Sequence, residues 1–129
     1  MTEEIIILYV EDNRENRLLV RRVLEAEGFK VHEAESAARA LESIRQSVPS
    51  LILMDINMPE IDGYTLTNRL RQNPKIRRVP IIAMTANVMK GDRERTLEAG
   101  CDGYIQKPID VDILGEQLKR FIDEVRHDG

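Results

Sequence analysis

Acidic residues, a hydroxyl and an amine follow the short apolar runs of this sequence. The chain places Glu11 and Asp12 after residues 5–10, Asp55 after 51–54, Thr85 at the end of 80–85 and Lys107 after 103–106. Like charges about 4 Å apart repel by roughly 4 kcal/mol at an effective dielectric constant of about 20, so ionised carboxylates that share a pocket need a cation. Oxygen ligands without His or Cys suit Mg²⁺, and Mn²⁺ is an acceptable substitute. The sequence therefore predicts a Mg²⁺ site, provided that these residues meet in the fold.

The hydroxyl and the amine extend this chemistry to a phosphoryl group. The Lys107 ammonium and the Thr85 hydroxyl would neutralise and hydrogen-bond phosphoryl oxygens, and such positioning is most of what a protein contributes to phosphoryl transfer. A carboxylate can itself be the nucleophile, which gives an aspartyl phosphate, and Asp55 is the central acid. Each residue alone has an ordinary structural explanation, so the hypothesis depends on their convergence.

The apolar runs predict the sheet that would bring these residues together. Residues 5–10, 51–55 and 80–85 are mainly apolar, as strands buried on both faces are, whereas 30–34 is more polar and suits an edge. Strands that alternate with helices form a parallel sheet, and ligands bind beyond the carboxyl ends of its strands. The expected fold class is α/β, a flavodoxin-like doubly wound five-stranded parallel sheet with five helices. Its order, 2-1-3-4-5, is taken by analogy with other doubly wound proteins.

Amphipathic segments between the runs predict the helices. Asn13 and Ser36 are suited to begin the first two helices, and Gly28 and Gly100 are suited to follow helix ends in the left-handed conformation. The fourth helix is expected over about 90–99. The apolar residues expected on inner helix faces are Leu19, Val20, Val23, Leu24, Ala37, Ala40, Leu41, Ile44, Leu66, Leu70, Leu114, Leu118, Phe121, Ile122 and Val125.

Length and composition set the class of protein. The chain has 129 residues, which suits one domain with a core over about 4–125, and it is 42% hydrophobic and 33% charged, as soluble globular proteins are. A net charge of -4 argues against nucleic-acid binding. One basic cluster is interpreted as a solvated helix end and loop, and it consists of Arg69, Arg71, Lys75, Arg77 and Arg78.

Features that mark other compartments are missing from the sequence. The single cysteine, Cys101, cannot form an internal disulfide, which suits a reducing compartment. No apolar stretch approaches the roughly 20 residues of a membrane span, and the acidic start is unlike a signal peptide. We expect a cytoplasmic protein without membrane contact, a monomer or weak homodimer.

Five separated blocks resemble the signature of response-regulator receiver domains. The blocks are residues 10–13 (Val-Glu-Asp-Asn), 53–59 (Leu-Met-Asp-Ile-Asn-Met-Pro), 62–63 (Asp-Gly), 84–86 (Met-Thr-Ala) and 104–108 (Tyr-Ile-Gln-Lys-Pro). The resemblance covers essentially the whole chain. Residues 86–92 also look like receivers of hybrid sensor kinases and of single-domain cell-cycle regulators.

The resemblance implies a role for each site residue. Glu11 (directly or through water), Asp12, Asp55 and the backbone carbonyl of Asn57 would bind Mg²⁺. Asp55 would be the phosphoacceptor, Lys107 the counter-charge of the phosphate, and Thr85 and Tyr104 the switch residues. The Lys107–Pro108 peptide bond would be cis, which only X-Pro bonds adopt readily.

The function that the resemblance implies is a signalling switch. A histidine kinase or a histidine phosphotransfer protein would donate a phosphoryl group from phosphohistidine to Asp55. The change would remodel the face of the fourth helix, fifth strand and fifth helix, which would control a downstream protein. Such a domain assists its own phosphorylation and dephosphorylation but is not a turnover enzyme.

Three other classes fit the sequence less well. A phosphatase of the haloacid dehalogenase type needs an aspartate two positions after its nucleophile, where this chain has Asn57. A flavin or dinucleotide binder needs a glycine-rich loop after the first strand, where residues 11–14 are Glu-Asp-Asn-Arg. A degenerate receiver, which serves only as an interaction surface, typically loses an acidic residue that is present here.

Overall fold

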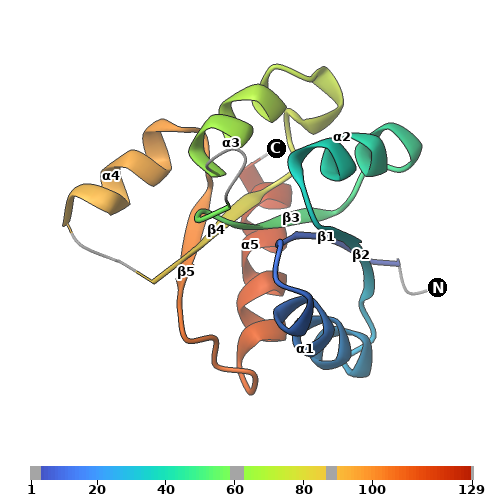
Figure 1. The fold of residues 1–129 in the computed structure, drawn as a ribbon. Helices are drawn as coiled ribbons and strands as arrows, with labels where there is room; N and C mark the ends of the chain where they lie inside the picture. The colour runs from blue at the N-terminus through green and yellow to red at the C-terminus, as the bar shows by residue number, and fades with distance from the viewer. Residues whose placement is uncertain (1–3, 59–62, 87–89, 129) are drawn as a thin grey trace.

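The predicted strands form one parallel sheet in the order β2-β1-β3-β4-β5, which confirms the expected fold class and order. The structure is a computed structural model that describes residues 4–58, 63–86 and 90–128 (Figure 1). Its strands are β1 (Ile6–Val10), β2 (Lys30–Ala34), β3 (Leu51–Asp55), β4 (Ile81–Thr85) and β5 (Gly103–Gln106). Three of the sequence blocks named above extend into parts of the chain outside the described residues, at positions 59, 62 and 87–89.

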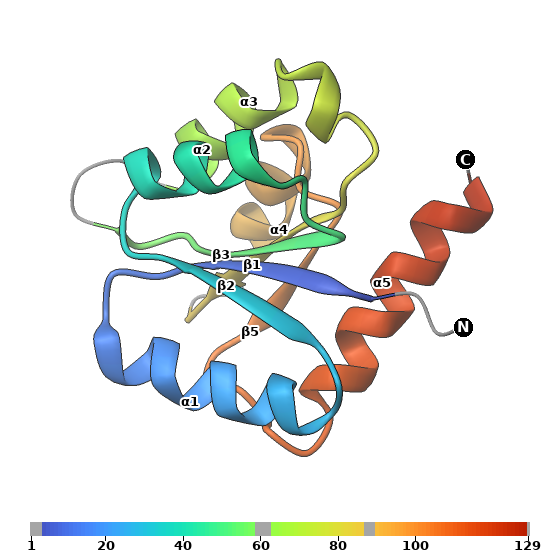
Figure 2. The same ribbon diagram turned by 90° about the vertical axis from the view of Figure 1, so that its right-hand side faces the viewer.

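Helices cover both faces of this sheet. Their bounds are α1 (Arg14–Ala26), α2 (Ala37–Gln46), α3 (Gly63–Arg71), α4 (Lys90–Glu98) and α5 (Leu114–Asp128). Figure 2 shows α2 and α3 on one side of the sheet and α1 and α5 on the other. The core accordingly consists of two clusters, one that includes Ile44 and Leu70 and another that includes Leu24 and Leu118. Successive residues of each strand alternate between them, as side chains of a strand must.

The expected capping residues begin the first two helices. The Asn13 side chain accepts a hydrogen bond from the backbone N–H of Asn16 at 2.9 Å, and Ser36 accepts one from Arg39 at 3.2 Å. Gly28 follows the end of α1 with a φ of 94°, a conformation that residues with a Cβ avoid. A short 3-10 helix, η1 (Pro74–Ile76), was not predicted.

One predicted core residue of α1 is wrong. Leu19 is 50% exposed, and Leu18 beside it is 46% exposed, whereas Val20 and Leu24 are buried. Each residue of a helix is rotated by about 100° from the one before, so a helix that packs on one strip of the sheet buries Val20 and turns Leu19 outward. The side chain of Val125 lies outside the described part of α5.

The interpretation of the basic cluster as solvated is wrong for Arg71. Its guanidinium donates hydrogen bonds to the backbone carbonyls of Gly100 (2.8 Å), Ile76 (2.9 Å) and Val79 (2.7 Å). It also pairs with the carboxylate of Asp102, which accepts the N–H of Ile81 at 2.9 Å. Because Asp102 and Ile81 stand at the starts of β5 and β4, this arginine clamp (Arg71 with Asp102) ties the amino-terminal edge of the sheet together.

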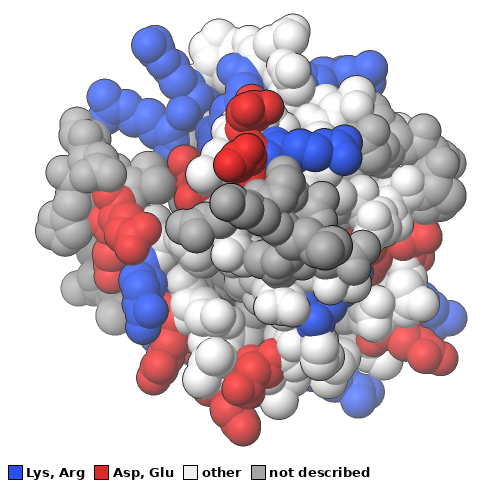
Figure 3. All heavy atoms as spheres, turned by 90° about the vertical axis from the view of Figure 1, so that its left-hand side faces the viewer, with Lys and Arg blue, Asp and Glu red and all other residues white. Residues whose placement is uncertain are grey.

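One face of the molecule shows how charges are distributed at the surface. Figure 3 shows Lys and Arg side chains interspersed with Asp and Glu over the face it presents. Among the helices within the described ranges, none combines the length and the apolar composition of a membrane span.

Candidate functional site

The carboxyl-terminal edge of the sheet gathers the three predicted carboxylates. Glu11 and Asp12 follow β1, and Asp55 is the last residue of β3. One oxygen from each carboxylate lies within 4.8 Å of the others, close enough for one cation to contact all three. This acidic cluster (Glu11, Asp12 and Asp55) is what parallel neighbouring strands produce when each ends in an acid.

Lys107 contacts this cluster directly, and Thr85 lies at the same edge of the sheet. The Lys107 Nζ donates to Asp55 Oδ1 at 2.9 Å, and the two side chains form an ion pair in which Asp55 is buried. Thr85 is the buried last residue of β4, and its carbonyl accepts the Lys107 N–H at 2.8 Å. The backbone N–H of Asn57 donates to Asp55 Oδ1 at 3.1 Å, whereas a metal-binding role of the Asn57 carbonyl stays a prediction.

The hydrogen bonding of the buried Glu11 carboxylate indicates whether the cluster fits a metal ion. The Glu11 side chain is 1% exposed, and its Oε1 accepts hydrogen bonds from Asn16 Nδ2 (3.0 Å) and from the Tyr9 hydroxyl (3.3 Å). Its Oε2 has no hydrogen-bond partner among the described residues. Buried polar atoms are nearly always paired, and a hard cation among oxygen ligands would supply the missing partner. The residues therefore fit Mg²⁺.

Burial and neighbouring groups shift the pKa values of Glu11 and Asp55 in opposite directions. Burial, reinforced by neighbouring Asp55, raises the pKa of Glu11 to about 7. Burial would also raise the pKa of Asp55, but the neighbouring Glu11 carboxyl and the hydrogen bonds from Lys107 and from the Asn57 N–H together hold it below its ordinary value. Below about pH 7 and without a cation, Glu11 therefore holds the proton more readily than Asp55, which leaves Asp55 as the ionised, nucleophilic carboxylate.

Tyr9 keeps its proton in this environment. Burial first, and then the Glu11 carboxylate, raises the pKa of the Tyr9 phenol well above its usual range. The hydroxyl is therefore a fixed hydrogen-bond donor to Glu11 at the inner side of the site.

Tyr104, the second predicted switch residue, lies apart from the acidic cluster. It is half-buried in β5 and packs against the core on the side of α2 and α3. Its partner in the sheet register is Ala83, which stands two residues before Thr85 in β4 and so shares the face of Thr85. The Lys107–Pro108 peptide bond that follows β5 is cis, as expected.

Sequence reasoning missed Arg17. Its Nη1 donates to the backbone carbonyls of Glu11 (2.8 Å) and Asp12 (2.9 Å), and its Nε pairs with Glu33 at 3.5 Å. An arginine in the first turns of a helix after an acidic pair is a common pattern. The sequence therefore carried no specific signal for this contact.

Comparison with known proteins agrees with this geometry. The sequence model of one protein family, the response regulator receiver domain, matches residues 7–119 of this chain. The polar-differentiation response regulator DivK of Brucella ovis is 41% identical over 124 residues, which cover 96% of this chain and 99% of DivK.

Solved structures show the same fold. The receiver domain of the sensor histidine kinase PA1611 from Pseudomonas aeruginosa, which has a magnesium ion coordinated in its active site cleft, gives a TM-score of 0.84 at 38% identity over 94% of this chain and 99% of that one. The chemotaxis protein CheY4 of Vibrio cholerae shares the fold with a TM-score of 0.88 at 24% identity, over 92% of this chain and 99% of its own. On the family match and on the identity with DivK, this chain belongs to the response regulator receiver domains of two-component signalling.

Proposed function

We propose that this receiver is a switch that accepts a phosphoryl group on Asp55 from the phosphohistidine of a histidine kinase or of a histidine phosphotransfer protein. The observation that carries the proposal is the pairing of ionised Asp55 with Lys107 inside the acidic cluster. Asp55 is a carboxylate ready to attack, and Lys107 is a cation beside the position of the incoming phosphate. The relationship to other receivers supports the same donor class.

Mg²⁺ is the proposed cofactor, with Mn²⁺ as a substitute. Glu11, Asp12, Asp55 and the backbone carbonyl of Asn57 would hold it, and the unpaired Glu11 oxygen and the magnesium ion of the PA1611 receiver support this assignment. When bound, the ion neutralises charge on the phosphoryl oxygens. The proton on Glu11 would leave when the cation arrives, because the cation lowers the pKa of its ligands.

The transfer step needs little from the protein beyond position and charge. An oxygen of the Asp55 carboxylate attacks phosphorus, the bond between phosphorus and the histidine nitrogen breaks, and its electron pair stays on the imidazole of the donor. Both described hydrogen bonds to Asp55 go to Oδ1. These contacts fix the plane of the carboxylate, and the Lys107 ammonium compensates the charge that the phosphoryl group brings.

The proposed output starts at Thr85. Its hydroxyl would donate a hydrogen bond to a phosphoryl oxygen, and the resulting shift would reach Tyr104 along the face that the two residues share in β4 and β5. Phosphorylation would thereby shift a two-state equilibrium of the face formed by α4, β5 and α5. A downstream protein that binds only one state of this face would read the signal.

The remaining properties follow from this role. We propose that the protein is not a turnover enzyme, because its phosphorylated Asp55 is itself the signal. It would act in the cytoplasm through protein contacts rather than by binding nucleic acid, as a monomer or weak homodimer. The mixed charge of the face in Figure 3 and the net charge of -4 support this choice of partner.

Acetyl phosphate provides the direct test of the phosphoacceptor. The parent protein and Asp55→Asn are incubated with this donor, with and without Mg²⁺, and analysed by intact mass and on a phosphate-affinity gel. We expect one base-labile phosphoryl group that requires both Mg²⁺ and Asp55. If acetyl phosphate and a phosphohistidine protein both leave the parent unmodified, the domain is an interaction module without phosphotransfer.

A further inference from the structure

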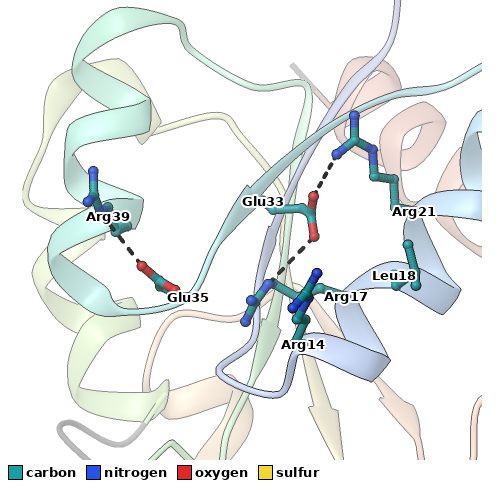
Figure 4. Close-up of a pocket in the computed structure, with 7 residues that line it drawn as sticks. All are labelled: Arg14, Arg17, Leu18, Arg21, Glu33, Glu35 and Arg39. Atoms are coloured by element: carbon teal, nitrogen blue, oxygen red, sulfur yellow. Dashed lines mark hydrogen bonds and ion pairs between the residues drawn. The ribbon is translucent and has the colours of Figure 1, made fainter.

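A cavity of about 520 Å³ opens between α1 and α2 beside the end of β2 (Figure 4). Its charged lining consists of four arginines and two glutamates. Figure 4 shows the Glu33 carboxylate between Arg17 and Arg21, with an ion pair to each. Arg17 also contacts the backbone of Glu11 and Asp12, whereas the described hydrogen bonds of Arg21 go to Glu25 and Glu33.

Arg17 joins the wall of this cavity to the backbone of the metal-binding segment. Its Nη1 lies 2.8 Å from the carbonyl oxygen of Glu11 and 2.9 Å from that of Asp12. The same guanidinium pairs through Nε with Glu33 Oε1 at 3.5 Å. Its side chain is 13% exposed, so most of the group is shielded from water that could replace it.

The contact fixes two consecutive peptide units. One rigid planar guanidinium holds the carbonyls of both Glu11 and Asp12. The backbone of these two residues is therefore restricted, and so are the directions of their side chains. The segment has a second tie to the same strand, because the Glu11 N–H donates to the Ala34 carbonyl at 2.9 Å. Strand β2 thus supports the segment twice, directly through Ala34 and through Glu33 and Arg17.

We infer that Arg17, held in place by Glu33, is a positioning residue that orients Glu11 and Asp12 for the cation. The inference rests on the proposed Mg²⁺ site and names residues that determine its affinity without touching the ion. Partners in the second layer of a metal site typically change its affinity by about 10–100-fold when they are removed.

Charge and position predict opposite effects, which makes the inference testable. Loss of a positive side chain near a cation site removes repulsion, so through charge alone it should tighten Mg²⁺ binding. Loss of a positioning contact should weaken it. Arg21 is the matched control, since it lies one turn along α1 and pairs with the same Glu33 at 2.8 Å. Its described hydrogen bonds go to Glu25 and Glu33 and not to the metal-binding segment.

The experiment measures Mg²⁺ dissociation constants by titration calorimetry for the parent, Arg17→Gln, Arg17→Lys and Arg21→Gln. Arg17→Gln should raise the dissociation constant about ten-fold or more, and Arg21→Gln should leave it unchanged or lower it. Arg17→Lys keeps the charge but loses the planar fork, so it should bind Mg²⁺ with intermediate affinity. Urea unfolding without Mg²⁺ verifies that each variant is folded at the temperature of the titration.

A second pair of variants tests the part played by Glu33. Glu33→Gln and Glu35→Gln each remove one negative charge from the lining of the same cavity, but the described ion pair of Glu35 is with Arg39 rather than Arg17. Glu33→Gln should weaken Mg²⁺ binding more than Glu35→Gln does. Equal dissociation constants for these two variants would remove Glu33 from the inference.

The failures of the two proposals are distinguishable. A parent protein that binds no Mg²⁺ overturns the proposed metal site and this inference with it. A parent that binds Mg²⁺, with Arg17→Gln binding as tightly as Arg21→Gln, overturns the positioning role alone.

Discussion

Each edge of the parallel sheet carries an arginine that holds backbone carbonyls and pairs with an acid, but the surroundings differ. At the amino-terminal edge, Arg71 contacts three carbonyls and Asp102, and Asp102 accepts a further N–H. At the carboxyl-terminal edge, Arg17 contacts two carbonyls beside the acidic cluster, where a buried oxygen of Glu11 has no hydrogen-bond partner within the described part of the chain. Similar chemistry thus stabilises one edge and prepares the other to bind a cation, at a cost in stability.

The largest effect is expected from breaking the arginine clamp. Arg71→Leu leaves three buried or half-buried carbonyls and Asp102 without their donor, so the free energy of unfolding should fall by about 3 kcal/mol. Urea unfolding without Mg²⁺ measures this change. Arg69→Leu, at an exposed position of the same helix, serves as the control and should cost under about 0.5 kcal/mol. Equal losses in the two variants would contradict a special role for the clamp.

The clamp also shows what the sequence could not reveal. Arg71 lies in a run of basic residues that suits a solvated surface, and its partners are mainly backbone carbonyls from two separate loops. Every residue has a backbone carbonyl, so the sequence does not indicate which carbonyls will contact a given side chain in the folded protein. The contacts of Arg17 with backbone carbonyls could not be predicted for the same reason. Leu19 was misplaced because a helical repeat of apolar residues does not give the width of the strip that is buried.

The acidic cluster was predictable for the opposite reason. Asp55 ends a short apolar run that is typical of a buried strand, and neighbouring parallel strands bring their carboxyl ends to the same edge. The side chains that meet there are therefore set by strand order and by position along the chain. What the sequence could not give is the division of protons between Glu11 and Asp55, which depends on burial and on the reach of Lys107.

A smaller effect is expected from the pH dependence of the carboxyl-terminal edge. The pKa of Glu11 rises from 4.5 to about 7 on folding, so the folded state binds a proton that the unfolded chain releases. This contribution to stability is fully present below about pH 4.5 and is lost as the pH rises through about 7, and roughly 2–3 kcal/mol of it is lost between pH 5 and pH 8. The lowered pKa of Asp55 acts in the opposite sense, giving stability above the ordinary carboxyl pKa that is lost at lower pH, and so lies outside this window.

Unfolding in urea without Mg²⁺ at pH 5 and pH 8 measures this dependence. The parent should lose more stability between these two values than Glu11→Gln, whereas Glu42→Gln at an exposed position of α2 should behave like the parent. A parent and a Glu11→Gln variant with the same pH dependence would show that Glu11 does not hold the proton.

The smallest effect is expected from removing one charge of the cluster. Without metal at pH 8, where Glu11 is also ionised, Asp55→Asn and Asp12→Ala should each raise the melting temperature by a few degrees, about 1 kcal/mol, because the remaining carboxylates repel each other less. For Asp55→Asn the loss of its ion pair with Lys107 opposes this gain. Its increase should therefore be larger at pH 8, where Glu11 is ionised in the parent, than at pH 6. A decrease in melting temperature for both variants would contradict a repulsive cluster.

If one edge of the sheet binds a cation and the other stabilises the fold, Mg²⁺ should distinguish the two edges. The measurement is the gain in the free energy of unfolding on adding saturating Mg²⁺ to the parent, Arg71→Leu and Asp55→Asn. Because a ligand stabilises the state that binds it, the parent and Arg71→Leu should gain equally, although the latter starts from lower stability. Asp55→Asn should gain much less. Equal gains in all three proteins would contradict this difference between the edges, because Mg²⁺ would then act elsewhere than at the acidic cluster.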